Sequence, residues 1–452
     1  MRWGGDVQGG EPYVFQDAHD SHQLVGFEVE IASGIARRLG LRPEFVQNDW
    51  TTLIASLERG DFDMILNGLE VTPARRARVA FTRPYYAFTE VLVVRRDEPD
   101  VHDLANLRGQ RVGTLGASLA YDLLQQAPQV QILLYEGVQE PYLDLEHGRL
   151  AGVLLDDVIA DRYGLVRPTL RAAATVGAGV YAIALRPQDA VLLEAVDGAL
   201  GAMRADGELR AILTRWHLWN DRQTALGGVM STTTNGPPSR LTFGQVLLFL
   251  RAAGFTVIIS ALAMSLAISG GLLLSLARRY GGRVARTLVA AYIEVFRGTP
   301  VLLQLYVLYY GLAPILRLDA FSAAVSGLGM NYAAYEAELY RAGIEAVPVG
   351  QTEAALSLGM SRALTLRRIV LPQALRVALP GIANDFIALL KDSSLVSVIT
   401  VVELTKQMTI TAVDVRSWVG PGLLCAGLYL ALSYPMSRLA RRLERRLTPV
   451  QS

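Results

Sequence analysis

The pattern of apolar and polar residues divides the chain of 452 residues into two unlike halves. Up to about residue 224, short apolar stretches alternate with segments whose apolar residues recur at helical spacing. Residues 27–40 and 51–59 are predicted helices, and the first of them ends in a glycine. Strands are predicted at residues 41–46, 62–66, 91–95, 111–115 and 152–155. This alternation predicts a two-lobed α/β fold with a ligand cleft between the lobes.

Beyond about residue 241 the chain consists mainly of long apolar runs. The first, 252–277, contains 26 residues without a charge, and a helix of that length spans about 39 Å, enough to cross a bilayer. Four further runs occupy residues 298–316, 320–335, 377–402 and 417–437. One such run can be a buried core helix, but five in succession predict an all-α transmembrane domain of about five helices.

Basic residues are concentrated in every second loop between these runs, as in loops that face the cytoplasm. Arg278, Arg279, Arg283 and Arg286 follow the first run, and Arg362, Arg367, Arg368 and Arg376 lie between the third and fourth. Five arginines follow the last run, at 438, 441, 442, 445 and 446. The intervening loops contain only Arg317 on one side and Lys406 with Arg416 on the other. An odd number of spans then places the N-terminal half outside the cytoplasm and the C-terminus inside. We therefore expect a multi-pass protein of the cell inner membrane, in contact with the lipid bilayer.

Composition narrows the function further. The net charge is +1, so no nucleic-acid partner is expected. Cys425 is the only cysteine, which excludes an intramolecular disulfide. No GxxxxGK[ST] phosphate-binding loop occurs, so the chain does not hydrolyse ATP by that route. We expect no metal site and no cofactor on this chain.

The predicted cytoplasmic loop 350–373 contains the most specific motif. It reads GQTEAALSLG at 350–359 and IVLPQ at 369–373. This resembles the EAA loop of ABC importer permeases, whose short coupling helices sit in a groove of the ATPase subunit. Small residues permit close helix approach, and a glycine lets the chain turn at a helix end. The resemblance implies that the ATPase-coupling residues are Glu353, Ala354, Gly359, Leu371 and Pro372.

Further segments between residues 241 and 445 resemble the polar amino-acid permeases. They are RGTP at 297–300 followed by Gln304, AYEAELYR at 334–341, and LKDSSL at 390–395. Ionisable side chains inside spans usually face a cavity or a partner. For Arg297, Glu338, Asp385 and Lys391, two interpretations remain open: they line the translocation path, or they hold helices together by pairing.

The N-terminal half resembles the polar amino-acid solute-binding proteins of family 3 over about residues 2 to 220. Motifs in the family's order include PYVF at 12–15, VGFEVEIA at 25–32, GDFD at 60–63, TPARR at 72–76, FTRPYY at 81–86 and LDD at 155–157. The resemblance implies that the cleft binds a free L-amino acid.

The same resemblance assigns individual ligand contacts. Arg75 takes the ligand carboxylate, a task suited to a planar guanidinium fork, although it can also be a solvated surface arginine. Asp156 holds the α-ammonium from the second lobe, or is a helix N-cap. Gly68 offers its carbonyl to the ammonium. Trp50 forms an aromatic wall of the pocket, or packs in the core, and Ser118 lies near the carboxylate donors of the second lobe.

Three departures from the family pattern concern the pocket. Glu70 stands where the family usually has serine or threonine beside the ammonium, and we count it among the candidate ligand-binding residues. Gly10 occupies a position where many members place an aromatic residue. The loop around Ser118 is shorter than the usual form. An added carboxylate favours a cationic or amide ligand, or it only reinforces the ammonium site.

We predict three segments: an extracytoplasmic solute-binding domain at 1–224, a flexible linker at 225–240 rich in Gly, Ser, Thr and Pro, and a permease domain at 241–452. The chain begins without a recognisable export signal, so we expect that the true start lies upstream.

The predicted function is the combined substrate-binding and permease subunit of an ATP-driven importer of polar amino acids, not an enzyme. It is expected to form a homodimer, or to pair with a second permease, and to recruit two copies of a separate ATPase that binds ATP and Mg²⁺. The main alternative is an amino-acid-gated receptor or channel, which shares the cleft fold but inserts its pore within the binding domain. A cell-wall lytic enzyme with a similar domain would need a catalytic domain that the apolar runs do not supply.

Overall fold

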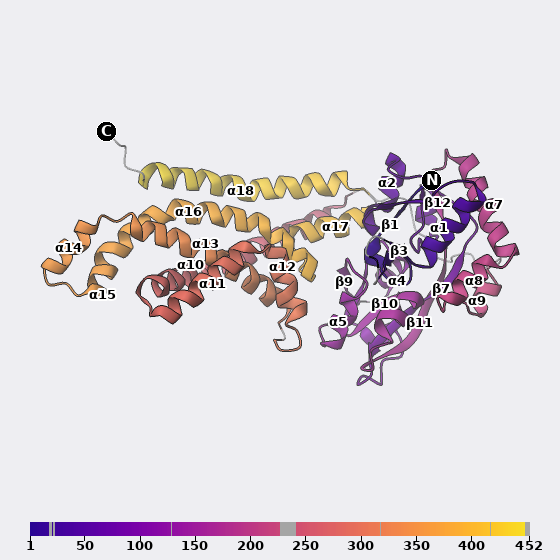
Figure 1. Cartoon of the computed structure of the whole chain (residues 1–452), viewed down its shortest axis with the longest axis horizontal. Helices are drawn as coiled ribbons and strands as arrows, with labels where there is room; N and C mark the ends of the chain where they lie inside the picture. Colours follow the sequence, from indigo (N-terminus) through magenta and orange to yellow (C-terminus); the bar gives the residue numbers. More distant parts are fainter. Residues whose placement is uncertain are drawn as a thin grey trace. The chain divides into compact units, whose positions relative to one another are not determined.

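The computed structural model of the chain describes residues 1–17, 20, 23–127, 129–226, 241–316, 318–415 and 417–447. The chain separates into two compact units, Met1–Ser239 and Arg240–Ser452 (Figure 1). Most of the predicted linker 225–240 lies outside the described residues, as do Arg317 and Arg416.

The first lobe of the first unit is built on a five-stranded sheet with the order β4-β1-β5-β12-β6. Strand β1 pairs in parallel with β4 and β5, and β12 pairs antiparallel with β5 and β6. The strands are β1 (Arg2–Gly5), β4 (Glu44–Gln47), β5 (Met64–Ile65), β6 (Ala80–Phe81) and β12 (Ala184–Leu185). The helices of this lobe are α1 (Phe27–Arg38), α2 (Leu53–Arg59), α3 (Pro73–Arg76), α7 (Ala190–Ala205) and α8 (Glu208–Arg215). A hairpin of β2 (Phe15–Gln16) and β3 (Leu24–Val25) precedes α1.

The second lobe has its own five-stranded sheet, with the order β11-β7-β10-β8-β9. Its strands are β7 (Tyr86–Arg95), β8 (Arg111–Leu115), β9 (Gln131–Tyr135), β10 (Gly152–Asp156) and β11 (Leu170–Tyr181). Its helices are α4 (Leu119–Gln126), α5 (Glu140–Glu146) and α6 (Asp157–Ile159), and α9 (Asp221–Thr224) follows α8 near the end of the unit.

Two short crossings connect the lobes, one between β6 and β7 and the other between β11 and β12. They run side by side, since the amide of Thr82 donates to Ile183 O at 3.0 Å and that of Tyr85 to Tyr181 O at 2.9 Å. The predicted two-lobed α/β fold is therefore confirmed. Its predicted elements recur with small shifts: helix 27–40 ends at Arg38, strand 41–46 begins only at Glu44, and helix 51–59 opens with a 3-10 turn at Trp50–Thr52.

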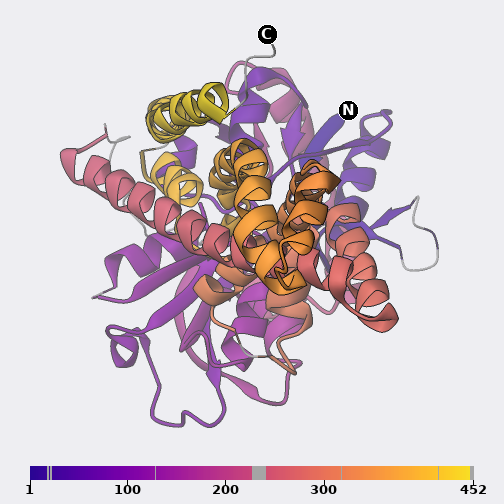
Figure 2. The same cartoon turned by 90° about the vertical axis from the view of Figure 1, so that its left-hand side faces the viewer.

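The second unit is helical, as predicted (Figure 2). Its long helices are α10 (Phe243–Tyr280), α11 (Arg283–Gly298), α13 (Ala320–Glu345), α16 (Leu371–Asp392) and α18 (Val419–Leu447). Shorter helices are α12 (Val301–Tyr306), α14 (Val349–Ser357), α15 (Arg362–Thr365) and α17 (Leu404–Val415). The segment after the first predicted span is not a loop. Arg278 and Arg279 lie in the last turn of α10, and Arg283 and Arg286 lie in α11.

Each of the five predicted apolar runs lies mainly on helix, but not every helix is apolar enough to span a membrane. Among the described residues, two helices are long and apolar enough, Phe243–Tyr280 and Val419–Arg442. A third span results if Arg283–Gly298 and Val301–Gly311, bent by 109°, count as one. The run 298–316 is thus not a straight helix. Helix α13 has 26 residues and α16 has 22, long enough to span, but both contain charged residues that lower their hydropathy.

Close packing of α10 against α13 depends on Gly271. A Cβ atom at this position would lie 2.5 Å from the Cβ of Glu336 and 2.9 Å from the amide nitrogen of Ala337. Only a residue without a side chain allows the two backbones to approach this closely.

Candidate functional site

A cavity in the first unit is lined by both lobes. Its lining residues come from the first-lobe segments around β1, α2 and β5 and from the second-lobe strands β7, β8 and β10 with the adjoining helices. The residues that line it include Tyr13, Trp50, Gly68, Glu70, Glu90, Ser118 and Asp156.

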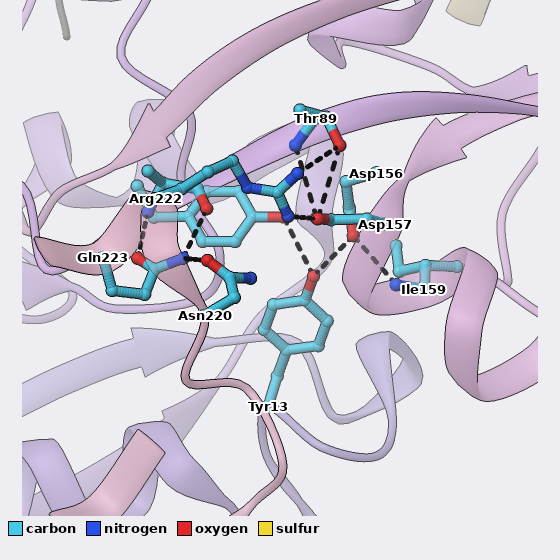
Figure 3. A network of polar contacts seen from close by, with 10 residues as sticks. Tyr13, Thr89, Asp156, Asp157, Ile159, Asn220, Arg222 and Gln223 are labelled. Carbon is cyan, nitrogen blue, oxygen red and sulfur yellow. Dashed lines mark hydrogen bonds and ion pairs between the residues drawn. The ribbon is translucent and has the colours of Figure 1, made fainter. Parts of the chain in front are cut away.

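Asp156 ends β10 and caps α6. Its Oδ1 accepts hydrogen bonds from the amide of Ile159 at 2.9 Å and from the hydroxyl of Tyr13 at 3.0 Å (Figure 3). Burial, with a contribution from the neighbouring Asp157, raises the pKa of Asp156 to about 7. The carboxyl group is therefore an N-cap, the structural interpretation of its sequence position, and it also lines the cavity. The two interpretations are compatible.

A polar network fixes the strand end beside Asp156. Arg222 forms an ion pair with Asp157 and donates to the hydroxyl of Thr89 at 3.1 Å (Figure 3). Gln223 donates to Ala87 O and accepts from the Ala87 amide, both at 2.8 Å. The end of the first unit is thereby joined to β7, so the ends of β7 and β10 are held in register.

Gly68 and Trp50 both line the cavity from the first lobe. Gly68 has φ +58°, and its amide donates to the buried carboxylate of Glu28 at 2.6 Å. The indole nitrogen of Trp50 donates to Gly116 O of the second lobe at 3.0 Å. Trp50 is thus a wall of the cavity and also a contact between the lobes.

Arg75 is buried, and its guanidinium is occupied by protein groups. Nη1 donates to Glu70 Oε2 at 2.7 Å and to Glu70 O at 2.8 Å, while Nη2 donates to Ala117 O at 2.6 Å. The guanidinium carbon lies 5.2 Å from the centre of the Trp50 ring. Arg75 is therefore buried, which contradicts the alternative interpretation of a solvated surface arginine. Among the described residues, Glu70 lines the cavity and Arg75 does not.

Glu70 connects the two lobes. Besides its ion pair with Arg75, its Oε1 accepts from the amide of Leu119 in the second lobe at 3.1 Å. Burial raises the pKa of Glu70, and the Arg75 charge opposes that rise. Ser118 caps α4: its hydroxyl accepts from the Tyr121 amide at 3.1 Å and donates to Leu115 O at 2.8 Å.

Glu90 and Tyr13 also line the cavity, although neither was among the predicted site residues. Glu90 lies in β7 and is 1% exposed, and burial followed by the charges of Glu70 and Asp156 raises its pKa well above the usual range. A single carboxylate in a mostly apolar strand is the sequence signal that could have identified Glu90. Tyr13 belongs to the PYVF motif, and its hydroxyl also lies 3.0 Å from that of Tyr181.

The loop 350–373 forms two short helices and the start of a third. Glu353 and Ala354 lie in α14, Gly359 follows it with φ +80°, and Leu371 and Pro372 open α16. Gln373 donates to Gln351 Oε1 at 3.1 Å, which joins the two ends of the loop. Leu358 is 84% exposed beside Gly359.

The ionisable residues of the predicted spans differ in their surroundings. Glu338 forms ion pairs with Arg278 and Arg341, which favours helix pairing for this residue. The guanidinium carbon of Arg297 lies 5.4 Å from the centre of the Tyr335 ring, a cation–π contact. Within the described part of the chain, Asp385 and Lys391 form no ion pair.

Comparison with known proteins gives matches for both units. Residues 5–218 match the model of bacterial extracellular solute-binding proteins, family 3, and residues 267–449 match the binding-protein-dependent transport system inner membrane component.

Curated relatives resemble one unit or the other. The probable amino-acid permease protein YxeN of Bacillus subtilis is 42% identical over 162 residues, 35% of this chain and 72% of that protein. The glutamine transport system permease protein GlnP of Escherichia coli is 39% identical over 207 residues, 44% of this chain and 93% of that protein. The ABC transporter arginine-binding protein 1 of Escherichia coli is 29% identical over 210 residues, 45% of this chain and 85% of that protein.

The predicted resemblances to a solute-binding protein and to a permease are therefore both confirmed. The chain belongs to the inner-membrane permeases of amino-acid ABC transporters and carries a family 3 solute-binding domain on the same polypeptide.

Proposed function

We propose that the chain captures an L-amino acid or a close derivative in the cleft of its own binding domain and passes it to its own permease domain. The observation that supports this most strongly is the convergence of Asp156, Gly68, Trp50 and Glu70 from two lobes on one cavity. A tether to the permease keeps the loaded domain at high effective concentration over the membrane unit.

Asp156 and Gly68 are proposed to hold the ammonium group, and Trp50 to cover the ligand from the first lobe. Arg75 is the proposed partner of a ligand carboxylate, which must then exchange with the Glu70 side chain. Ser118 is proposed to act through the start of α4, because its hydroxyl is committed to the helix cap.

The permease family implies an ABC ATPase partner. We propose that two copies of this ATPase, with ATP and Mg²⁺, dock on the loop 350–373 of a permease homodimer, and that the chain itself catalyses no reaction. The binding domain is proposed to face away from the cytoplasm and the C-terminus to face it. Membership in the permease family favours import over the alternative of an amino-acid-gated channel.

The test uses the full chain in lipid nanodiscs and a panel of L-amino acids and their amines, titrated by calorimetry. At least one ligand is expected to bind, and Asp156→Asn should weaken it by about tenfold or more. Glu58→Gln, at an exposed ion pair with Arg78 outside the cavity, is the control. Equal binding by wild type and Asp156→Asn would contradict the assigned cleft.

A further inference from the structure

The ionisable groups that line the cavity all have one sign. They are the carboxyl groups of Asp6, Glu70, Glu90, Glu136 and Asp156. Within the described residues, no lysine, arginine or histidine lines it. Asp6 is occupied by hydrogen bonds from the amides of Gln8 and Trp50, at 2.9 Å each. A ligand therefore meets an acidic surface.

The donors that would suit a ligand carboxylate already hold a carboxylate of the protein. Glu70 Oε2 accepts a hydrogen bond from Arg75 Nη1 at 2.7 Å, and Glu70 Oε1 accepts one from the Leu119 amide at 3.1 Å. One donor comes from each lobe, and Leu119 is the first residue of α4, where the helix favours an anion. The remaining Arg75 contacts go to the main-chain carbonyls of Glu70 and Ala117. An incoming carboxylate must displace Glu70 to reach either donor.

Glu90 supplies a second, independent observation. It lies directly opposite Asp156 in the antiparallel pairing of β7 with β10, so the two carboxyl groups project from the same face of the sheet. Among the described residues, neither oxygen of Glu90 has a partner at hydrogen-bond distance and angle, although the side chain is buried and lines the cavity. The nearby amide of Ala120 opposes the rise in the pKa of Glu90 but does not cancel it. Ionising a buried carboxyl group that has no partner is costly, and a bound cation offsets that cost.

A metal ion fits this arrangement less well than an organic cation. No group of three or more metal-ligating side chains occurs among the described residues. The cavity also has apolar walls from Leu115, Val138 and Leu155 and the aromatic side chains of Tyr13 and Trp50. Such walls suit the carbon skeleton of an amine or a guanidine.

We propose that Glu90 and Asp156 form a cation subsite and that the side chain of Glu70 occupies the anion subsite in place of a ligand carboxylate. The cleft then binds an organic amine or guanidine, and the ligand does not need a carboxylate of its own. This rests on the proposed function, because it takes the cleft as the ligand site of the transporter.

The test compares matched pairs of ligands that differ only in the carboxylate. Arginine with agmatine, lysine with cadaverine and ornithine with putrescine are titrated by calorimetry into the full chain in nanodiscs, with glutamine as a neutral ligand. For at least one pair, the amine is expected to bind within about threefold of the amino acid or more tightly, and glutamine about tenfold more weakly.

Two variants separate the subsites. Glu70→Thr frees Arg75 and the Leu119 amide, so the amino acid of the pair should gain about tenfold in affinity while its amine gains nothing. Glu90→Gln should weaken both members by about tenfold. Glutamine is a neutral side chain of the same shape as the protonated glutamic acid, so the unfolding temperature of Glu90→Gln without ligand should not fall. Glu58→Gln, at an exposed ion pair with Arg78, is the control.

The possible outcomes are distinct. Binding of an amino acid with no measurable binding of its amine would overturn this inference and leave the proposed function standing. Unchanged affinities in Glu90→Gln, confirmed as folded by its melting curve, would also overturn it. If no amino acid and no amine binds, the cleft is not the ligand site and the proposed function fails with it.

Discussion

Tyr13 and Asp156 join the two lobes across the cleft: the hydroxyl of Tyr13 donates to Asp156 Oδ1 at 3.0 Å, although 143 residues separate them in sequence. Three further contacts also cross the cleft: Trp50 to Gly116 O, Arg75 to Ala117 O, and Leu119 N to Glu70. The lobes are thus held together by the protein's own side chains. A ligand that enters must keep these contacts or replace them.

The hydrogen bond of Trp50 tests the value of one such contact. Trp50→Phe keeps an aromatic ring against Arg75 but removes the bond to Gly116 O. We expect ligand affinity to fall by about fivefold, corresponding to about 1 kcal/mol. Trp216→Phe is the control, because its indole donates to Glu30 within the first lobe. It should leave the affinity unchanged, and an equal loss in both variants would contradict a role for Trp50 in joining the lobes.

Arg75→Lys keeps the positive charge but loses the planar fork. A lysine cannot hold Glu70 and Ala117 O together in the geometry of the guanidinium. Affinity for the ligand should therefore fall by at least about 2 kcal/mol, measured by calorimetry on the full chain. Arg76→Lys, at the exposed neighbouring position, should bind like wild type. Unchanged binding in Arg75→Lys would reject Arg75 as a residue of the site.

Local sequence patterns were sufficient to predict several elements of the fold, although strands such as β9 and β11 were not predicted. The apolar spacing of residues 27–40 and the apolar strand 111–115 correspond to α1 and β8, because α1 buries one face in the first lobe and β8 is buried within the sheet of the second. The bend between α11 and α12 was not predicted, because the absence of charges in the run 298–316 does not reveal a change in the direction of the helix axis.

The contacts between site residues could not be predicted from the sequence, for a different reason. Glu70 was recognised as a departure from the family, but its contact with Leu119 joins residues 49 positions apart in different lobes. Glu90 meets Asp156 only through the register of β7 with β10. Such partners follow from tertiary structure, and no periodicity in the sequence encodes them.

The buried carboxyl groups predict an unusual dependence of stability on pH. Burial raises the pKa of Glu28 and of Asp156 to about 7, against about 4 in an unfolded chain. Between these values the folded state binds more protons, so its stability is highest at low pH. It should fall as pH rises from about 4 to about 7, by up to about 1.4 kcal/mol per pH unit for each group, and level off above about 7.

Urea unfolding of the ligand-free chain, followed by tryptophan fluorescence between pH 5 and 8, measures this trend. Asp156→Asn should flatten the slope. The affinity for a cationic ligand should change in the opposite direction and increase with pH, because Asp156 binds a cation only when ionised. Stability that rises over this range would show that these carboxyl groups are ionised in the folded protein.

The last prediction concerns coupling to the ATPase. Gly359 follows α14 with φ +80°, and a Cβ at this position would meet no atom of the chain within 4 Å. A side chain at position 359 therefore projects into space that no other atom of this chain fills. Gly359→Asp should leave ligand binding intact but abolish ligand-stimulated ATP hydrolysis by the partner ATPase in reconstituted vesicles, because a charged side chain blocks the close approach of the coupling helices. Gly359→Asn has the same size and tolerates the left-handed backbone, so the difference between the two variants isolates the charge. If Gly359→Asp retains full stimulation, the loop 350–373 is not the ATPase docking site, whereas parallel losses in Asp and Asn would attribute the block to bulk alone.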